Sequence, residues 1–139
     1  MPETYDGLGI SFLYPETWKL YEDEEAGTVS LETPSGSFIT ITACADLPAA
    51  LKQAQQAMQA EYEEVEQELI ETEIAERTLR GVAQRFVYLD LIVTSRLLGI
   101  DVDDNRFLVQ IQGEDRELEE QQRVFDAILT SLIQSLSSA

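Results

Sequence analysis

The sequence predicts an α+β fold in which an antiparallel β-sheet is flanked by helices. Three observations support this prediction. Short runs rich in β-branched and aromatic residues alternate with turn residues in the first third of the chain. A longer block of the same kind spans residues 82–112 and is interrupted by turn-forming residues between Asp103 and Asn105. Two stretches with the apolar spacing of helices lie outside these blocks.

The first third of the chain is predicted to form short antiparallel strands. Residues 10–14 read as an extended segment, and Pro15 ends it because proline has no backbone N–H for the ladder. Residues 28–33 and 38–44 carry apolar side chains at alternate positions. The residues that join them fit a β-turn, since Pro34 fixes φ at its second position. We therefore predict a hairpin over residues 28–44.

Two stretches have the period of an amphipathic helix. Over residues 48–67, apolar side chains recur at steps of three and four, and Asp46 stands where an N-cap belongs. Residues 117–136 repeat this pattern, and Asp115 is the expected N-cap. Glutamates in the first turn of this second stretch favour the positive end of the helix dipole.

The segment between the helices is predicted to supply the centre of the sheet. Residues 70–75 alternate as a strand with one wet face, and Arg80 and Gly81 are expected to turn the chain into residues 82–112. Apolar residues occupy both parities of that block, which predicts cover on both of its faces. The residues expected in the core include Phe86, Ile92, Phe107, Phe125 and Leu129.

Charge and composition exclude several classes of function. Nine basic residues against 27 acidic ones give a formal net charge of −18, which repels nucleic acid and anionic membrane surfaces. The chain has no histidine and one cysteine, Cys44, which we interpret as a buried inert thiol. No zinc spacing or phosphate-binding loop is present, so we expect no metal or cofactor. The start shows no leader pattern, and we expect a cytoplasmic protein.

Residues 101–105 begin like a calcium-binding loop, with oxygen-bearing side chains at the first, third and fifth positions. The pattern fails at the sixth position, which holds Arg106 where the sharp turn needs glycine. It fails again at the twelfth, where Gln112 replaces the bidentate glutamate. A hairpin turn uses the same Asp and Asn residues because they tolerate left-handed φ. We therefore favour a turn over a calcium site.

Asp90 is the candidate for a buried carboxylate, because it falls inside the central block beside Tyr88 and Leu91. A buried carboxylate requires a partner, which Arg85 or Arg96 could supply. An ion pair or an edge position is the favoured interpretation, and a catalytic role is the alternative.

One short region combines aromatic and acidic residues around a proline-containing bend. Core packing is the favoured interpretation of Trp18, since a tryptophan buries a large area, and a partly exposed aromatic floor is the alternative. Interfaces draw their energy from aromatic anchors, while exposed charges mainly set the association rate. The predicted binding residues are Tyr14, Trp18, Tyr21, Glu22, Asp23, Glu24 and Glu25. The acidic run would steer in a basic or amphipathic protein or peptide segment.

The order of these patterns resembles the PsbP-like superfamily, which includes Ran-binding nuclear import factors, the oxygen-evolving-complex subunit and DcrB-like bacterial proteins. The resemblance is carried by an apolar-Pro-x-x-Trp opening that ends at Trp18, by a Gly-x-Ala motif at Gly81 and Ala83, and by the closing helix around residues 125–132. It implies one PsbP-like domain over residues 1–139, with an antiparallel sheet between helices as an α/β/α sandwich. It also implies non-catalytic protein binding, since some DcrB-like members are cytoplasmic chaperones for type VI secretion effectors.

We therefore expect a non-enzymatic protein-binding, adaptor or chaperone module, with a homodimer kept open. One alternative is a small-ligand carrier with an apolar cavity between sheet and helix. The other is a carboxylate-based hydrolase that uses Asp90 or a pair of glutamates.

Overall fold

The computed structural model describes residues 2–137, which form nine strands and two helices. The strands are β1 (Pro2–Gly7), β2 (Ile10–Pro15), β3 (Lys19–Asp23), β4 (Thr28–Glu32), β5 (Phe38–Ala43), β6 (Glu66–Ile74), β7 (Arg77–Tyr88), β8 (Leu91–Val102) and β9 (Asn105–Glu114). The helices are α1 (Leu47–Glu61), between β5 and β6, and α2 (Asp115–Ser137), which follows β9.

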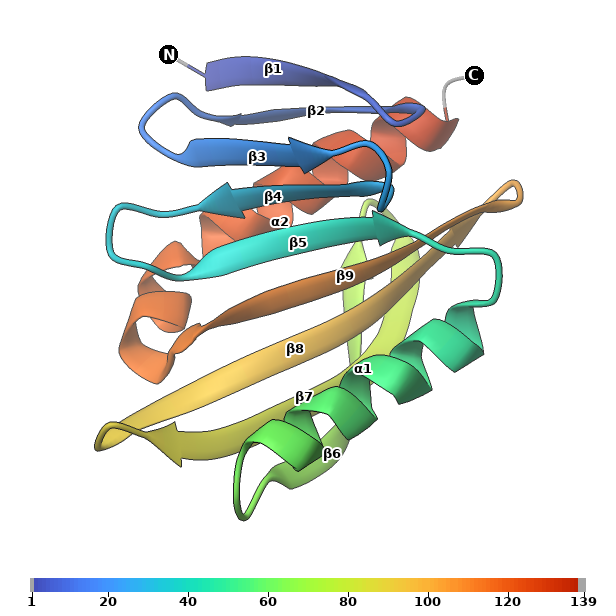
Figure 1. The fold of residues 1–139 in the computed structure, drawn as a ribbon. Helices are drawn as coiled ribbons and strands as arrows, with labels where there is room; N and C mark the ends of the chain where they lie inside the picture. The colour runs from blue at the N-terminus through green and yellow to red at the C-terminus, as the bar shows by residue number, and fades with distance from the viewer. Residues whose placement is uncertain (1, 138–139) are drawn as a thin grey trace.

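Seven of the strands form one antiparallel sheet in the order β3-β4-β5-β9-β8-β7-β6, and β1 pairs with β2 as a separate hairpin (Figure 1). The predicted central block is confirmed, because it supplies most of β7, all of β8 and most of β9. The predicted hairpin over residues 28–44 is also confirmed as β4 and β5. Its turn is closed by hydrogen bonds from the Thr33 N–H to the Ser37 carbonyl and from the Gly36 N–H to the Thr33 carbonyl.

The two helices cover opposite faces of the sheet, α1 in front and α2 behind in Figure 1. On one face of β7, the Gln84 side-chain amide donates to the Gln55 carbonyl of α1 at 3.1 Å. On the other face, the Thr94 hydroxyl of β8 donates to the Asp115 carboxylate of α2 at 2.5 Å. The expected α+β sandwich is therefore confirmed, with α1 and α2 packed on different faces of the sheet.

The first helix ends earlier than the sequence predicts. α1 stops at Glu61, Tyr62 is its extended C-cap, and β6 already begins at Glu66. The helix predicted over residues 48–67 is therefore confirmed up to residue 61 and wrong beyond it. The side chain of Tyr62 stacks on Phe86 with ring centroids 4.0 Å apart, which anchors the end of the helix. Leu69, which continued the helical period, lies on the edge strand β6 and is 88% exposed.

The second helix is confirmed, but its cap differs from the prediction. The carboxylate of Glu114 accepts the N–H groups of Arg116 at 3.1 Å and Glu117 at 3.2 Å. Asp115, the predicted N-cap, lies one residue later and pairs instead with Arg85 of β7. A carboxylate at either position satisfies first-turn donors, so the sequence pattern could not separate them.

The turn between β6 and β7 lies at Ala75 and Glu76, with φ of 52° and 65°, and the turn predicted at Arg80 and Gly81 is wrong. Gly81 lies inside β7, where an added Cβ would stand 1.7 Å from the Leu97 carbonyl oxygen. Glycine is required there because the backbone of β8 approaches closely.

The hydrophobic core lies mainly between the sheet and α2. Phe86, Phe107, Phe125 and Leu129 are buried as predicted, and each contributes about 1.5–3 kcal/mol by leaving water. Ile92 is 50% exposed, so its predicted burial is wrong. The reason is its position near the end of the β7–β8 hairpin, two residues before the Thr94 contact with α2.

One carboxylate ties the β4–β5 turn to α2. Glu117 Oε1 accepts hydrogen bonds from the Thr33 hydroxyl at 2.6 Å, the Ser37 hydroxyl at 2.5 Å and the Ser37 N–H at 3.2 Å. Burial alone would raise the pKa of Glu117, but the donors at Ser37 and Thr33 outweigh it and hold the pKa below its usual range. Glu117 is therefore ionised at neutral pH and fastens the helix to the sheet.

Candidate functional site

The end of the β7–β8 hairpin exposes a run of large hydrophobic residues. The chain turns there at Leu89 and Asp90, whose φ values are 50° and 65°. The exposed fractions are 67% for Val87, 52% for Tyr88, 78% for Leu89, 52% for Leu91 and 50% for Ile92. We call these five residues the hairpin tip. Among the described residues, the other large hydrophobics with comparable exposure, Leu13, Tyr21 and Leu69, are scattered over β2, β3 and β6.

The hairpin tip extends beyond the cover of both helices. Tyr62, just after α1, stacks on Phe86 and lies in a T-shaped contact with Tyr88, with ring centroids 5.7 Å apart, so cover on that face ends at the ring of Tyr62. The tip presents Tyr88 and Leu91 on this face and the cross-strand pair of Val87 and Ile92 on the other. An apolar surface of this kind is commonly a site of interaction.

Asp90 occupies the turn of this hairpin and is exposed, so its predicted place among buried strand residues is wrong. Neither pairing considered for it is found among the described residues, because Arg85 contacts Asp115 instead and Arg96 forms no ion pair. Asp90 has φ in the left-handed region, which aspartate tolerates better than most residues. Asp90 therefore suits the turn conformation that this hairpin adopts.

Acidic residues surround the side of the tip next to α1. Glu61, Glu63 and Glu64 flank Tyr62 and are exposed. The apolar tip is thus bordered by carboxylates, which gives this end of the molecule one apolar and one negative part.

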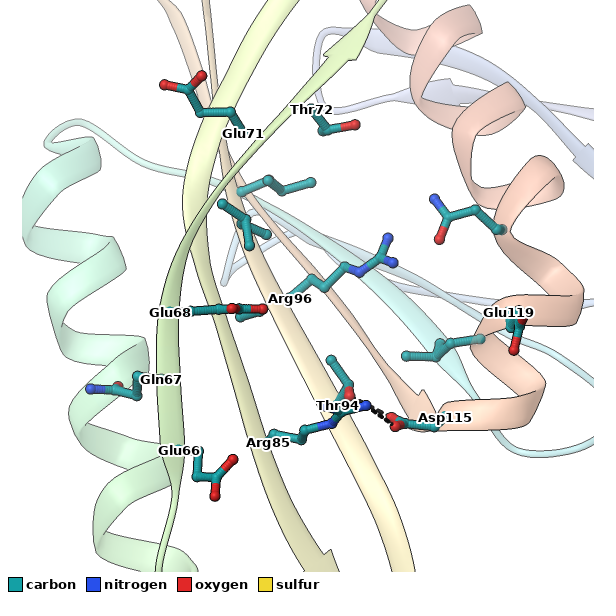
Figure 2. A pocket seen from close by; sticks show the side chains of 15 residues that line it. Glu66, Gln67, Glu68, Glu71, Thr72, Arg85, Thr94, Arg96, Asp115 and Glu119 are labelled. Carbon is teal, nitrogen blue, oxygen red and sulfur yellow. Dashed lines mark hydrogen bonds and ion pairs between the residues drawn. The ribbon is translucent and has the colours of Figure 1, made fainter.

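A cavity of about 700 Å³ lies on the α2 side of strands β6, β7 and β8 (Figure 2). Its floor consists of cross-strand rows, and one row joins Glu68, Ala83 and Arg96. The next row toward the core joins Ile70, Gly81 and Leu98. The first turns of α2 complete the wall.

Arg85 and Asp115 form an ion pair at the end of the cavity nearest the hairpin tip (Figure 2). The hydrogen bond and charge of Asp115 raise the pKa of Arg85 further above its already high ordinary value. Asp115 also accepts from the Thr94 hydroxyl, so it is held from two strands. This contact fixes the start of α2 against the sheet.

The aromatic residues of the predicted binding corner do not share one surface. Trp18 is 6% exposed and packs against Phe125 with ring centroids 5.2 Å apart, which confirms the core-packing interpretation. Tyr14 is half-buried beside Phe12, whereas Tyr21 on the edge strand β3 is 53% exposed. Trp18 is therefore removed as a surface anchor.

The acidic residues of that corner, Glu22, Asp23, Glu24 and Glu25, are all exposed. The carboxylate of Glu22 accepts from the Tyr5 hydroxyl at 2.5 Å, and Asp23 accepts from the Ala26 N–H at 3.1 Å within the turn. Binding of a partner by Tyr14, Tyr21 and this acidic run stays a prediction.

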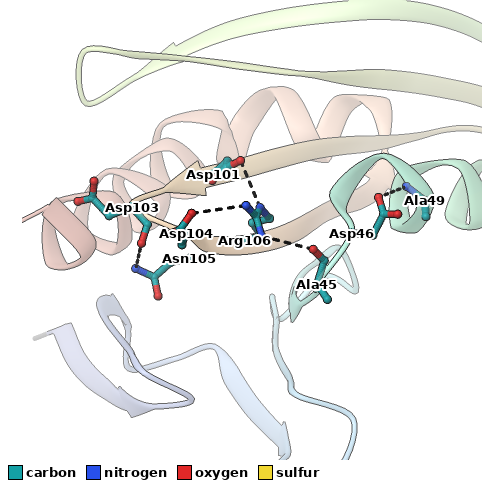
Figure 3. Close-up of polar contacts among 8 residues, drawn as sticks. All are labelled: Ala45, Asp46, Ala49, Asp101, Asp103, Asp104, Asn105 and Arg106. Atoms are coloured by element: carbon teal, nitrogen blue, oxygen red, sulfur yellow. Dashed lines mark hydrogen bonds and ion pairs between the residues drawn. The ribbon is translucent and has the colours of Figure 1, made fainter.

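The acidic residues that began like a calcium loop form the turn between β8 and β9 (Figure 3). Asp103 and Asp104 have φ of 50° and 68°, as the turn interpretation requires. The guanidinium group of Arg106 forms ion pairs with the carboxylates of Asp101 at 3.4 Å and Asp104 at 3.5 Å. It also donates a hydrogen bond to the Ala45 carbonyl at 3.5 Å. The carboxylates are thus engaged by a guanidinium group.

Cys44 follows β5 and is half-buried. Burial raises the pKa of its thiol, and the nearby Arg106 lowers it by less. The reactive thiolate is therefore disfavoured at neutral pH. Within residues 2–137, no group of three or more acidic or cysteine side chains could hold a metal ion. Neither helix in this range has the length and apolarity needed to span a bilayer.

Comparisons with known proteins establish the fold. No family model and no curated protein matches the sequence. The solution structure of cyanobacterial PsbP (CyanoP) from Synechocystis sp. PCC 6803 is similar, with a TM-score of 0.63 and 13% identity over 94% of this chain and 90% of that chain. A Bacteroides thetaiotaomicron protein also gives 0.63, at 15% identity over 93% of this chain and 47% of its own. A Pseudomonas aeruginosa protein of unknown function, PA94, gives 0.55 at 14% identity over 94% and 95%. The expected PsbP-like fold is confirmed.

The hairpin tip was missed by reasoning from the sequence, which named a cavity between sheet and helix only as an alternative and assigned no residue to it. A usable signal for the tip was the pair Leu89 and Asp90 between two β-rich runs, which permits a turn without glycine. No local signal existed for the cavity, because Glu68, Ala83 and Arg96 are brought together only by strand register.

Proposed function

We propose that this chain is a non-enzymatic protein-binding module whose PsbP-like fold presents the hairpin tip to a basic, amphipathic segment of another protein. The observation that carries this proposal is the exposure of Val87, Tyr88, Leu89, Leu91 and Ile92 at one end of one hairpin. An exposed apolar surface costs solubility unless it is covered in use, and burial of such side chains supplies the energy of an interface.

The charge around the tip favours a basic partner. Glu61, Glu63, Glu64 and Asp90 are exposed beside it, and the whole chain carries a formal net charge of −18. A second copy of the chain would bring like charges together, and an anionic membrane would be repelled in the same way. A segment with apolar residues on one side and lysine or arginine on the other meets both parts of this surface.

An enzymatic role has less support from the geometry. Acid–base catalysis by carboxylates needs one carboxyl with a raised pKa beside another that stays ionised. Glu117 has a lowered pKa, and its Oε1 is occupied by donors from Thr33 and Ser37. The carboxylate of Asp115 likewise accepts hydrogen bonds from Arg85 and Thr94.

The proposal is tested with a labelled synthetic peptide of leucine and lysine, arranged to form an amphipathic helix, titrated with protein and followed by fluorescence anisotropy. A Leu89→Ser/Ile92→Ser variant keeps the protein charge and removes apolar area from the tip. Leu13→Ser is the matched control, because Leu13 is also 50% exposed but lies on β2. We expect the tip variant to bind at least about tenfold more weakly and the control to bind as the parent does.

Equal affinity of all three proteins would contradict the proposal, because it would show that charge alone attracts the peptide. Two further results would replace the proposed partner. Self-association in sedimentation experiments that the tip variant abolishes would make the partner a second copy. Binding to phosphatidylcholine vesicles that the tip variant abolishes would make the tip a membrane contact.

A further inference from the structure

Arg96 lies on the floor of the cavity between β6–β8 and α2, and its side chain extends into the cavity (Figure 2). This side chain is half-buried and forms no hydrogen bond or ion pair with any residue in the described range 2–137. Among the described residues, the other half-buried basic side chain is that of Arg106, and it pairs with Asp101 and Asp104. A guanidinium left without a partner in a chain with 27 acidic residues is available to an anion from outside.

Glu68 opens onto the same cavity from the neighbouring edge strand. It is paired in register with Ala83 of β7, and Ala83 is paired with Arg96 of β8. Two strand spacings place the Cα atoms of Glu68 and Arg96 on the order of 10 Å apart on one face of the sheet. Only the methyl group of Ala83 stands between them in this row, and no ion pair joins the two charged side chains.

The surface beside this charged row is apolar. Ile70 and Leu98 belong to the next cross-strand row, and Leu118 faces the cavity from α2. A ligand that reaches from Arg96 to Glu68 therefore passes over a methyl group and along aliphatic side chains. The volume of about 700 Å³ lies within the usual range for small-molecule sites.

From these contacts we infer that the cavity binds a dipolar organic ligand, in which a carboxylate and an ammonium group are held apart by a short apolar spacer, as in lysine and ω-amino acids. The carboxylate pairs with Arg96 and the ammonium with Glu68. Simple anions are disfavoured because Glu66 and Glu119 also border the cavity, and simple cations leave Arg96 without a partner. This site is separate from the proposed docking at the hairpin tip and does not rest on it.

A matched ligand series tests the inference. ε-Aminocaproate carries both charges, caproate carries only the carboxylate and n-hexylamine carries only the ammonium. We expect ε-aminocaproate to bind at least about tenfold more tightly than either of the others, as measured by titration of backbone amide signals in NMR. The shifted signals should belong to β6, β8 and the first turns of α2. Equal binding of caproate, shifts confined to another region, or no shifts with any of the three would overturn the inference.

Variants assign the two charges. Arg96→Gln should weaken ε-aminocaproate binding at least about tenfold, and Glu68→Gln should lower its preference over caproate. Arg96→Lys keeps the charge and should retain part of the affinity. It replaces Arg96→Gln in the comparison if Arg96→Gln disturbs folding. Arg123→Gln is the control, because Arg123 is exposed on α2 and does not line the cavity. Unchanged affinity in folded Arg96→Gln would show that Arg96 is merely solvated and would overturn the assignment.

Discussion

The two halves of strand β8 carry similar apolar side chains, but one half is buried and the other begins at the exposed hairpin tip. Leu97 and Ile100 are 0% exposed near the middle of the domain, whereas Leu91 and Ile92 are 52% and 50% exposed at the hairpin tip. The strand is continuous between them and pairs with β7 throughout the tip region. β-Propensity therefore explains the strand, but the covering helices decide which part of it becomes core.

The boundary between the covered and the exposed part of the β7–β8 hairpin lies between two neighbouring cross-strand pairs. On one face, Tyr62 covers Phe86, and on the other, Asp115 begins α2 beside Thr94. The pair of Val87 and Ile92 is the first one beyond both covers. Substitutions in the covered part should therefore destabilise the protein more than substitutions at the hairpin tip.

The largest effect is expected in the covered region. Phe107→Ala should lower the free energy of unfolding by about 3–5 kcal/mol, because it leaves a cavity where a ring that is 5% exposed now packs. Chemical denaturation of parent and variant measures the difference. A loss below about 1 kcal/mol would show that this part of β9 is not core.

Gly81→Ala should destabilise the protein by up to about 3 kcal/mol, since the new Cβ would meet the Leu97 carbonyl oxygen at 1.7 Å and force β7 and β8 apart. Gly9→Ala is a useful comparison, because its Cβ would meet nothing within 4 Å and only its φ of 77° disfavours alanine. Thermal unfolding of the two variants should show the larger loss for Gly81→Ala, and the reverse order would contradict the close approach.

Glu117→Gln should cost about 1–3 kcal/mol at neutral pH, because the donors at Thr33 and Ser37 lose their ionised acceptor. A carboxyl with a lowered folded-state pKa adds stability above its ordinary pKa, and that stability is lost as the pH falls through the folded-state value. The difference between parent and variant should therefore persist at pH 7 and shrink below the ordinary pKa of 4.5. A difference that does not change between pH 7 and pH 3 would contradict this role.

The smallest effect on stability is expected at the hairpin tip. Leu89→Ser should change the free energy of unfolding by no more than about 0.5 kcal/mol, because Leu89 is 78% exposed in the folded protein. Urea denaturation with a coincident midpoint for parent and variant would support this expectation. A loss comparable to that of Phe107→Ala would mean that the tip is covered in solution.

Much of the fold could be predicted because its signals are local. The alternation in β4 and β5, the turn chemistry at Pro34 and the apolar stripe of α2 all act over a few residues. The end of α1 could not be predicted, because Tyr62 leaves the helix to reach Phe86, which is distant in the sequence. The same limit applied to Asp90, which was placed in a strand because the apolar residues on both sides concealed a turn.

The candidate sites depended even more on non-local information. Exposure of Ile92 follows from where two helices end, and the row of Glu68, Ala83 and Arg96 follows from strand register. Trp18 shows the opposite case, since its size alone favoured burial, and it packs against Phe125. Residue type thus predicted core anchors better than it predicted surfaces.

The central claim, that the uncovered end of the β7–β8 hairpin is the docking surface, is tested most directly by an NMR titration of the labelled protein with the leucine–lysine peptide. We predict that the largest amide shifts fall between residues 86 and 93 and in the acidic segment around Tyr62, with little change near Tyr21 on β3. Shifts concentrated at Tyr21 and residues 22–25, with the hairpin tip unchanged, would contradict the account. They would place the interaction at the binding residues predicted from the sequence instead.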